Sequence, residues 1–112
     1  MINTVMVVED NTSFRSGIIK LFRRSGLTVW AFPNAEEAAR ALTGCCPDVA
    51  ILDVSLPGMK GTEFGRMVEQ RSPNTRIIYV TAAPESIVRG TKEKEILAKP
   101  IEPEALMARM KR

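Results

Sequence analysis

The sequence contains no histidine, and this absence excludes several kinds of site at once. Without an imidazole the chain can form neither a Ser-His nor a Cys-His nucleophile pair, and it has no histidine ligand for a metal ion. Its only cysteines, Cys45 and Cys46, are adjacent, a spacing that rarely closes a disulfide because the geometry is strained. Since there is no Cys-x-x-Cys motif either, we interpret them as small, partly buried residues in a loop between a helix and a strand.

The sequence also lacks a long apolar run. No run approaches the roughly 20 residues that a membrane-spanning helix needs. No N-terminal stretch combines basic residues, an apolar segment and a small-residue cleavage site. We therefore expect a cytoplasmic protein that makes no contact with a membrane.

Aromatic residues are few, at 5% of the chain, and the basic residues form no stripe. The net charge is +3, but the 16 lysines and arginines are spread from Arg15 to Arg112 with only short clusters. This distribution favours solvated helix faces over a nucleic-acid surface, which needs a basic patch. Direct nucleic-acid binding is therefore not expected.

What the chain does have is a regular alternation of short apolar runs and stretches with helical periodicity. In 112 residues, of which 45% are hydrophobic, this alternation predicts one domain over 1–112 built from βα units around a parallel sheet. We expect strands at 4–8, 27–32, 48–53, 76–81 and 95–98. We expect helices at 12–25, 34–43, 62–71 and 104–111, and a short helix starting at Pro84 within 82–94 that Gly90 soon ends.

Local signals support two of these helices. Gly26 is a natural end for the first helix, and Asn34 followed three residues later by Glu37 resembles a capping box that opens the second. The first helix has an apolar face with the spacing i, i+4, i+7 and i+8, formed by Phe14, Ile18, Leu21 and Phe22.

Right-handed crossovers leave few arrangements for five such units. The strand order 2-1-3-4-5 gives an α/β, three-layer, doubly wound (βα)₅ parallel sheet of the flavodoxin-like type, here with a shortened fourth helix. In this order the winding direction reverses between the first and third strands, whose carboxyl ends carry Asp10 and Asp53. Ligands bind at such a reversal, so we expect these two acids to flank a binding crevice.

Polar residues follow four of the predicted strands at the point where each ends. Glu9 and Asp10 follow the first strand, Asp53 ends the third, Thr81 ends the fourth and Lys99 follows the fifth. The carboxyl ends of parallel strands share one edge of the sheet, so these side chains should lie together. Clustered carboxylates favour a hard cation, and a hydroxyl with a lysine beside them suits a phosphoryl group.

Each of these residues also has an ordinary structural interpretation. A lone aspartate after a strand is usually a turn residue or a helix cap, Thr81 could be another cap, and Lys99 a surface lysine. Their joint occurrence at four strand ends favours the functional interpretation. Phe14 is evenly balanced between a core residue and one that contacts a partner.

The whole chain resembles the receiver domain of bacterial two-component response regulators. The resemblance covers motifs at the strand ends and two positions in between. These are Val8-Glu9-Asp10, Arg15, Gly26, Asp53-x-x-Leu56-Pro57-Gly58-Met59-x-Gly61, Thr81-Ala82 and Lys99-Pro100.

The resemblance implies that Asp53 is the phosphoacceptor. It would take a phosphoryl group from a phosphohistidine on a histidine kinase or histidine phosphotransfer domain, since this chain has no histidine. Asp10, Asp53 and the backbone carbonyl of Ser55 would bind Mg²⁺, and Glu9 would hold a water of the metal ion. The domain would catalyse only its own phosphorylation and dephosphorylation.

By the same resemblance, Lys99 would pair with Asp53 and then with the phosphoryl group, while Thr81 would donate a hydrogen bond to that group. Two features depart from the family. Ile96 stands where members usually carry tyrosine or phenylalanine, which removes the usual aromatic switch. The interval from Thr81 to Lys99 is about one helical turn short, ~4 residues, so the usual output surface is also altered.

Two alternatives stay open. The first is a pseudo-receiver, an interaction module with no phosphorylation-dependent output. The second, ranked last, is a phosphatase with an aspartate nucleophile, a class that prefers Asp-x-Asp, whereas Ser55 stands at the third position here. The sequence names neither the kinase nor the output target, and it leaves open whether the chain is complete or a fragment.

Overall fold

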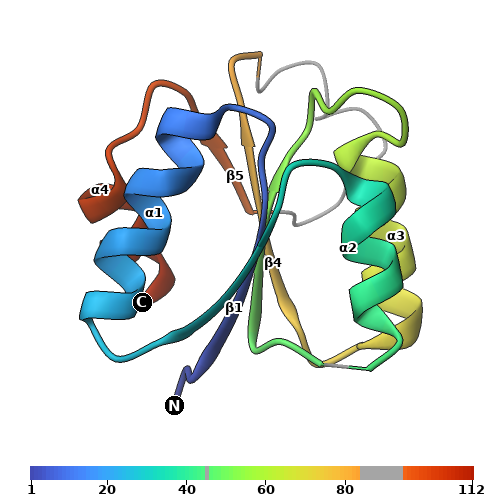
Figure 1. The fold of residues 1–112 in the computed structure, drawn as a ribbon, viewed down its shortest axis with the longest axis horizontal. Coiled ribbons are helices and arrows are strands. Elements are labelled where there is room, and N and C mark those ends of the chain that lie inside the picture. Colours follow the sequence, from blue (N-terminus) through green and yellow to red (C-terminus); the bar gives the residue numbers. More distant parts are fainter. Residues whose placement is uncertain (45, 84–94) are drawn as a thin grey trace.

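The computed structural model describes residues 1–44, 46–83 and 95–112 (Figure 1). The strands in these residues are β1 (Thr4–Val8), β2 (Thr28–Phe32), β3 (Val49–Asp53), β4 (Arg76–Thr81) and β5 (Glu95–Ala98). The helices are α1 (Thr12–Arg24), α2 (Ala35–Leu42), α3 (Gly61–Arg71) and α4 (Pro103–Met110). The short helix predicted to start at Pro84 lies outside the described residues, as does Cys45.

The strands form a five-stranded parallel sheet in the order β2-β1-β3-β4-β5, which confirms the predicted topology. Helices α1 and α4 cover one face and α2 and α3 cover the other, giving three layers (Figure 1). The chain leaves β1 and β3 toward opposite sides of the sheet, because β1 leads to β2 and β3 leads to β4. The carboxyl ends of β1 and β3 therefore bound the crevice where the winding reverses.

Alternating residues of the central strands fill two separate cores. Odd-numbered positions of β1 such as Val5 and Val7 pack with Ile18 and Phe22 of α1, and even-numbered positions such as Met6 pack with the α2–α3 side. Every residue of β3 is buried, as expected for a central parallel strand covered on both faces. These two cores hold β1 and β3 rigidly, and with them the side chains at their ends.

The helix ends follow the local signals in the sequence. The side chain of Asn11 accepts a hydrogen bond from the backbone N–H of Phe14 at 2.9 Å and so caps α1. The predicted pairing of Asn34 with Glu37 is confirmed, because the Glu37 N–H donates to the Asn34 side chain at 2.8 Å. The last helix begins at Pro103, one residue earlier than predicted, since proline fits the first turn of a helix.

Two further sequence expectations concern the burial of the cysteines and membrane-spanning helices. Cys46 is exposed, so the prediction of partial burial is wrong for this residue. In the part of the chain that the structure describes, none of the helices is long and apolar enough to cross a membrane.

Candidate functional site

Glu9 is buried at the end of β1 and is held there by the backbone. Only 2% of the residue is exposed, and its Oε2 accepts a hydrogen bond from the N–H of Asn11 at 3.0 Å. Its own carbonyl accepts a hydrogen bond from Arg15 Nη1 at 2.7 Å. Arg15, to which the sequence motifs assign no role, thus fixes the turn that carries the acidic pair. Asp10, next in the chain, is exposed.

Asp53 is buried at the end of β3, with 4% of the residue exposed. Its Oδ1 accepts a hydrogen bond from the N–H of Ser55 at 3.0 Å. Helix α3 starts against the backbone of Asp53, where any Cβ on Gly61 would collide with the Asp53 carbonyl. Glycine is therefore required at position 61 for α3 to begin this close to the phosphoacceptor candidate.

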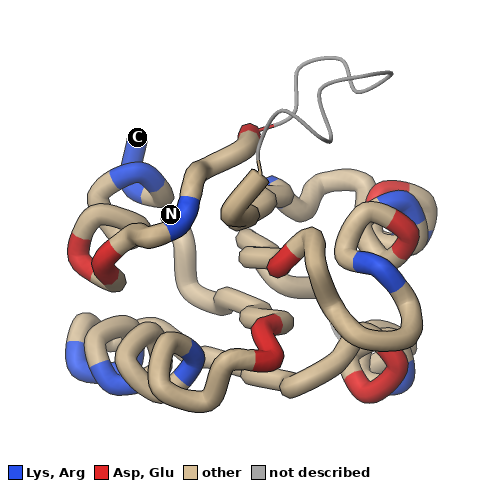
Figure 2. Tube along the Cα trace, turned by 90° about the horizontal axis from the view of Figure 1, so that it is seen from above, with Lys and Arg blue, Asp and Glu red and all other residues tan. Residues whose placement is uncertain are grey.

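The carboxylates of Glu9, Asp10 and Asp53 each place one oxygen within 4.8 Å of the others. Lys99 bridges two of them, with Nζ 2.9 Å from Glu9 Oε1 and 3.4 Å from Asp53 Oδ2. Among the described side chains, one ammonium thus contacts two of the three acids, so the cluster has fewer positive charges than negative ones. Figure 2, looking down on this edge, shows acidic positions between the helices, whereas α1 carries only basic charges.

The titration behaviour of the cluster reflects this crowding. Burial, together with the neighbouring Asp53, raises the pKa of Glu9 to about 7, even though its hydrogen bonds with Lys99 and Asn11 act in the opposite direction. Desolvation alone would raise the pKa of Asp10, but its hydrogen bonds with Asp53 and Glu9 have the larger effect and lower that pKa. Burial acts to lower the pKa of Lys99, but its contacts with Glu9 and Asp53 outweigh it and raise that pKa.

Lys99 reaches the acids from the end of β5 on the far side of β4. Its backbone N–H donates to the carbonyl of Thr81 at 2.8 Å, which ties the ends of β4 and β5 together. Its ammonium also lies 5.3 Å from the centre of the Phe14 ring, within the range of a cation–π contact. Carboxylates on one side and the face of the Phe14 ring on the other therefore hold this ammonium over the crevice.

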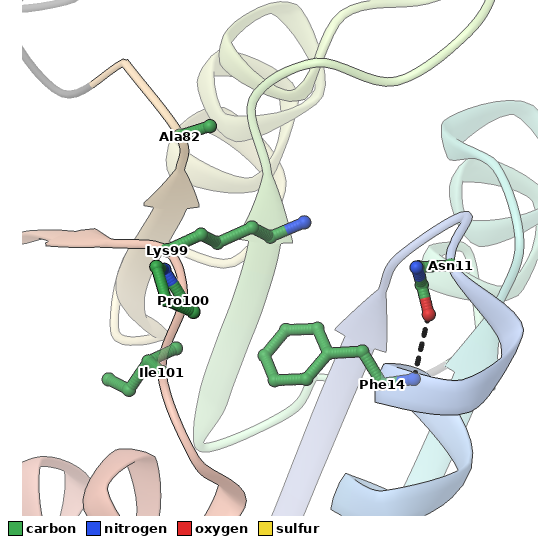
Figure 3. A pocket seen from close by; sticks show the side chains of 6 residues that line it. All are labelled: Asn11, Phe14, Ala82, Lys99, Pro100 and Ile101. Carbon is green, nitrogen blue, oxygen red and sulfur yellow. Dashed lines mark hydrogen bonds between the residues drawn. The ribbon is translucent and has the colours of Figure 1, made fainter.

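A pocket of about 350 Å³ opens beside Lys99, between the start of α1 and the chain that follows β5 (Figure 3). The ring of Phe14 projects across it toward Pro100 and Ile101. Phe14 is half-buried, packs against the core and also lines this pocket, so the core role is confirmed and the partner contact stays a prediction.

Thr81 and Ile96 occupy the places that the predicted strands give them. Thr81 is buried at the end of β4, and its hydroxyl accepts a hydrogen bond from the N–H of Ala83 at 3.1 Å. Between described residues, Thr81 shares no hydrogen bond with the three carboxylates. Ile96 is half-buried and packs on the α2–α3 side of the sheet.

One contact near the site had no counterpart in the sequence analysis. Glu36, in the first turn of α2, accepts a hydrogen bond from the N–H of Met59 in the loop between β3 and α3. The turn at Pro57-Gly58, where Gly58 has a φ of +74°, was the available signal for a tight loop, but it does not indicate the partner.

The fold and the site together define a doubly wound α/β domain with an acidic crevice at the carboxyl edge of its sheet. The chain matches the response regulator receiver domain over residues 5–111, and it belongs to this family of two-component signalling domains. The resemblance inferred from the strand-end motifs is thereby confirmed.

Similar proteins extend the comparison. The chain is 36% identical over 78 residues to the DNA-binding transcriptional regulator NtrC of Escherichia coli K12, and 39% identical over 80 residues to nodulation protein W of Bradyrhizobium diazoefficiens. These alignments cover 70% and 69% of this chain but only 17% and 34% of the two relatives. The chain therefore spans less than two thirds of the length of these relatives.

Solved structures match the full chain. The chemotaxis response regulator CheY4 of Vibrio cholerae has a TM-score of 0.88 at 28% identity, with 100% of this chain and 98% of that chain covered. The BeF3-activated receiver domain of DrrB has a TM-score of 0.86 at 29% identity, with 100% and 97% covered. The likeness supports the complete three-layer architecture.

Proposed function

We propose that residues 1–112 form one cytoplasmic receiver domain that accepts a phosphoryl group on Asp53 and thereby changes its binding to a downstream protein. The donor is a phosphohistidine on a histidine kinase or a histidine phosphotransfer domain. The observation that carries the proposal is the buried Asp53 carboxylate beside two further acids, with the Lys99 ammonium 3.4 Å from its Oδ2. No other described group of acids has this arrangement.

The two oxygens of Asp53 have different partners, which suits a nucleophile. The Ser55 N–H holds Oδ1, and Lys99 holds Oδ2. An Asp53 oxygen attacks phosphorus, the P–N bond of the phosphohistidine breaks, and its electron pair leaves with the imidazole of the partner. Lys99 then follows the transferred charge from the carboxylate to a phosphoryl oxygen, so it neutralises negative charge on both sides of the step.

The acidic cluster also fits a divalent cation. Its donors are hard carboxylate oxygens, and among the described side chains one ammonium, that of Lys99, contacts two of the three acids. Asp10, Asp53 and the backbone carbonyl of Ser55 would hold Mg²⁺ directly, with Glu9 acting through water. When bound, this ion offsets the repulsion between the acids and the incoming phosphoryl oxygens.

Thr81 and the chain after it would report the modification. The Thr81 oxygen accepts from Ala83, so its hydroxyl proton can donate to a phosphoryl oxygen. Ile96 has no flat ring to move inward behind Thr81, and we therefore propose that the response passes through the backbone after β4. The surface that binds the downstream target then contains no aromatic side chain at position 96.

A pseudo-receiver is the second candidate. Ile96 favours it, because the aromatic switch of the family is missing. In this case the fold serves as an interaction module, and no chemistry occurs at Asp53.

Intact-mass spectrometry after incubation with acetyl phosphate and Mg²⁺ separates the two candidates. The wild type should gain the mass of one phosphoryl group, and Asp53→Asn should gain none, because the amide is not a nucleophile. Asp48→Asn, a matched change of an exposed aspartate at the opposite edge of the sheet, should be labelled like the wild type.

The control conditions make the outcome decisive. A chelator should abolish labelling of the wild type. Labelling that persists in Asp53→Asn, or that is undiminished by the chelator, contradicts the assignment of the site. Complete absence of labelling in the wild type, from acetyl phosphate and from a phosphorylated phosphotransfer domain, supports the pseudo-receiver.

A further inference from the structure

The loop between β3 and α3, residues 54–60, leads directly away from Asp53 and includes Ser55. Its two ends are fixed by the backbone, because the Gly61 N–H donates to the Val54 carbonyl at 3.2 Å and the Val54 N–H donates to the Val80 carbonyl at 3.1 Å. Leu56 is 1% exposed and anchors the first half in the core. The second half, around Gly58 and Met59, lies toward the surface.

One side chain from another helix holds this second half. The Met59 N–H donates to Glu36 Oε2 at 2.8 Å. Of loop positions 56–59, Met59 alone hydrogen-bonds to another element within the described part of the chain. Gly58 has a φ of +74°, and a Cβ at this position would lie 2.5 Å from the same Glu36 oxygen. The carboxylate of Glu36 therefore packs directly against the backbone of the turn, because Gly58 has no side chain.

Glu36 is well placed for this contact before any ligand binds. It lies in the first turn of α2, whose start is capped by Asn34. The hydrogen bond from Met59 lowers the pKa of Glu36, so the acceptor is ionised at neutral pH. A charged acceptor makes a stronger hydrogen bond than a neutral one. Helix α2, which contributes no ligand to the proposed cation site, thus constrains the loop that does.

We infer that Glu36 is a positioning residue for the divalent cation at the carboxyl edge. By holding Met59 it fixes the β3–α3 loop, and with it the Ser55 carbonyl and the Ser55 N–H that orients Asp53 Oδ1. Magnesium demands near-ideal ligand geometry, so a loosened loop should weaken its binding even though no ligand is removed. This inference rests on the proposed function, because it needs the cation to bind at Asp53.

The test compares adjacent glutamates by titrating Mg²⁺ in a calorimeter. Glu36→Ala should weaken Mg²⁺ binding by several-fold and up to about tenfold, the lower end of the cost of losing a direct partner of a metal ligand, because Glu36 acts on Ser55 through the loop. Glu36→Gln keeps an acceptor for the Met59 N–H and should bind Mg²⁺ within about twofold of the wild type. Glu37→Ala is the matched control, since Glu37 pairs with Asn34 in the same turn and does not touch the loop.

Two further readouts separate positioning from simple loss of structure. Amide exchange at Met59 should speed up in Glu36→Ala and not in Glu37→Ala. Both alanine variants should lower the melting temperature slightly, while only Glu36→Ala loses Mg²⁺ affinity. If Glu36→Ala binds Mg²⁺ as the wild type does, or if Glu37→Ala loses as much affinity, the positioning role is wrong. A wild type that binds no Mg²⁺ overturns the proposed cation site itself.

Discussion

The two edges of the sheet both carry acidic and basic residues, but these charges are paired differently at each edge. At the carboxyl edge, three acids lie within 4.8 Å of one another and Lys99 contacts two of them. At the amino edge, Arg76 begins β4 and meets both carboxylate oxygens of Glu95, at 2.9 and 3.0 Å. Its guanidinium also donates to carbonyls at the end of α4, at 2.8 Å for Met110 and 3.2 Å for Arg109.

Asp48 completes the contrast at the amino edge. Its Oδ2 accepts hydrogen bonds from the backbone N–H groups of Asn3 and Thr4, at 2.8 and 3.0 Å. The charges of Arg76, Glu95 and Asp48 are thus matched by groups of the fold itself and serve to join chain segments. At the carboxyl edge the acids are gathered in excess, which costs stability unless a ligand supplies positive charge. The comparison teaches that unmatched charge, rather than charge as such, distinguishes the functional edge.

Replacing Arg76 should have the largest effect on stability at the amino edge. Arg76→Met removes a charged donor from two α4 carbonyls and from Glu95, and should lower the free energy of unfolding by about 2 kcal/mol. Part of the ion pair is exposed and contributes little. Urea denaturation measures the change, with Arg71→Met, an exposed residue on α3, as the control that should stay within about 0.5 kcal/mol.

The Mg²⁺ affinity of the same variant tests whether the two edges of the sheet act independently. Mg²⁺ affinity of Arg76→Met, measured below the unfolding transition, should match that of the wild type, because the amino edge serves structure alone. A variant with unchanged stability, or one with strongly reduced Mg²⁺ affinity, would break the separation of the two edges.

A smaller effect is expected at Asp48, and it should depend on pH. The hydrogen bonds from Asn3 and Thr4 lower the pKa of Asp48 in the folded state. A lowered folded pKa means that the contribution is fully present above the unfolded value, 3.8, and is lost as pH falls through the folded pKa. Asp48→Ala should cost less than about 1 kcal/mol at neutral pH, since the site is solvent-exposed.

The pH profile supplies its own control. The difference in unfolding free energy between wild type and Asp48→Ala should shrink as the pH is lowered below about 4, the ordinary range of an aspartate pKa. A difference that stays constant, or grows, as the solution becomes more acidic contradicts the role given to the ionised carboxylate.

Much of the carboxyl edge was predictable because it depends on strand periodicity. The bounds of β1, β4 and β5 and the strand order were as expected, and these place Glu9, Asp10, Asp53 and Lys99 at one edge. Apolar runs are local signals, and parallel pairing then determines which ends meet. The position of Lys99 over both Glu9 and Asp53, instead of Asp53 alone, and the bond from Arg15 to the Glu9 carbonyl needed the structure.

The matched charges of the amino edge could not be predicted in the same way. Arg76 meets Glu95 and α4 through contacts between residues far apart in the chain, and the same holds at the carboxyl edge for the contact of Glu36 with Met59. Their side chains have no periodic pattern, and an arginine or glutamate at a surface position is ordinarily solvated. Packing of the helices on the sheet selects these pairs, so they emerge only when the tertiary arrangement is known.

The most direct test of the account is the free energy of unfolding of wild type and Asp10→Asn, each with and without Mg²⁺. Without Mg²⁺ the two proteins should differ little, because the hydrogen bonds that lower the pKa of Asp10 offset the removal of one charge from the crowded cluster. At a concentration of Mg²⁺ about 100 times the dissociation constant, the wild type should gain about 2.7 kcal/mol and the variant much less, so the wild type becomes clearly the more stable protein.

A wild type that gains no more stability from Mg²⁺ than Asp10→Asn does would contradict the claim that the excess of acids at the carboxyl edge exists to hold a cation.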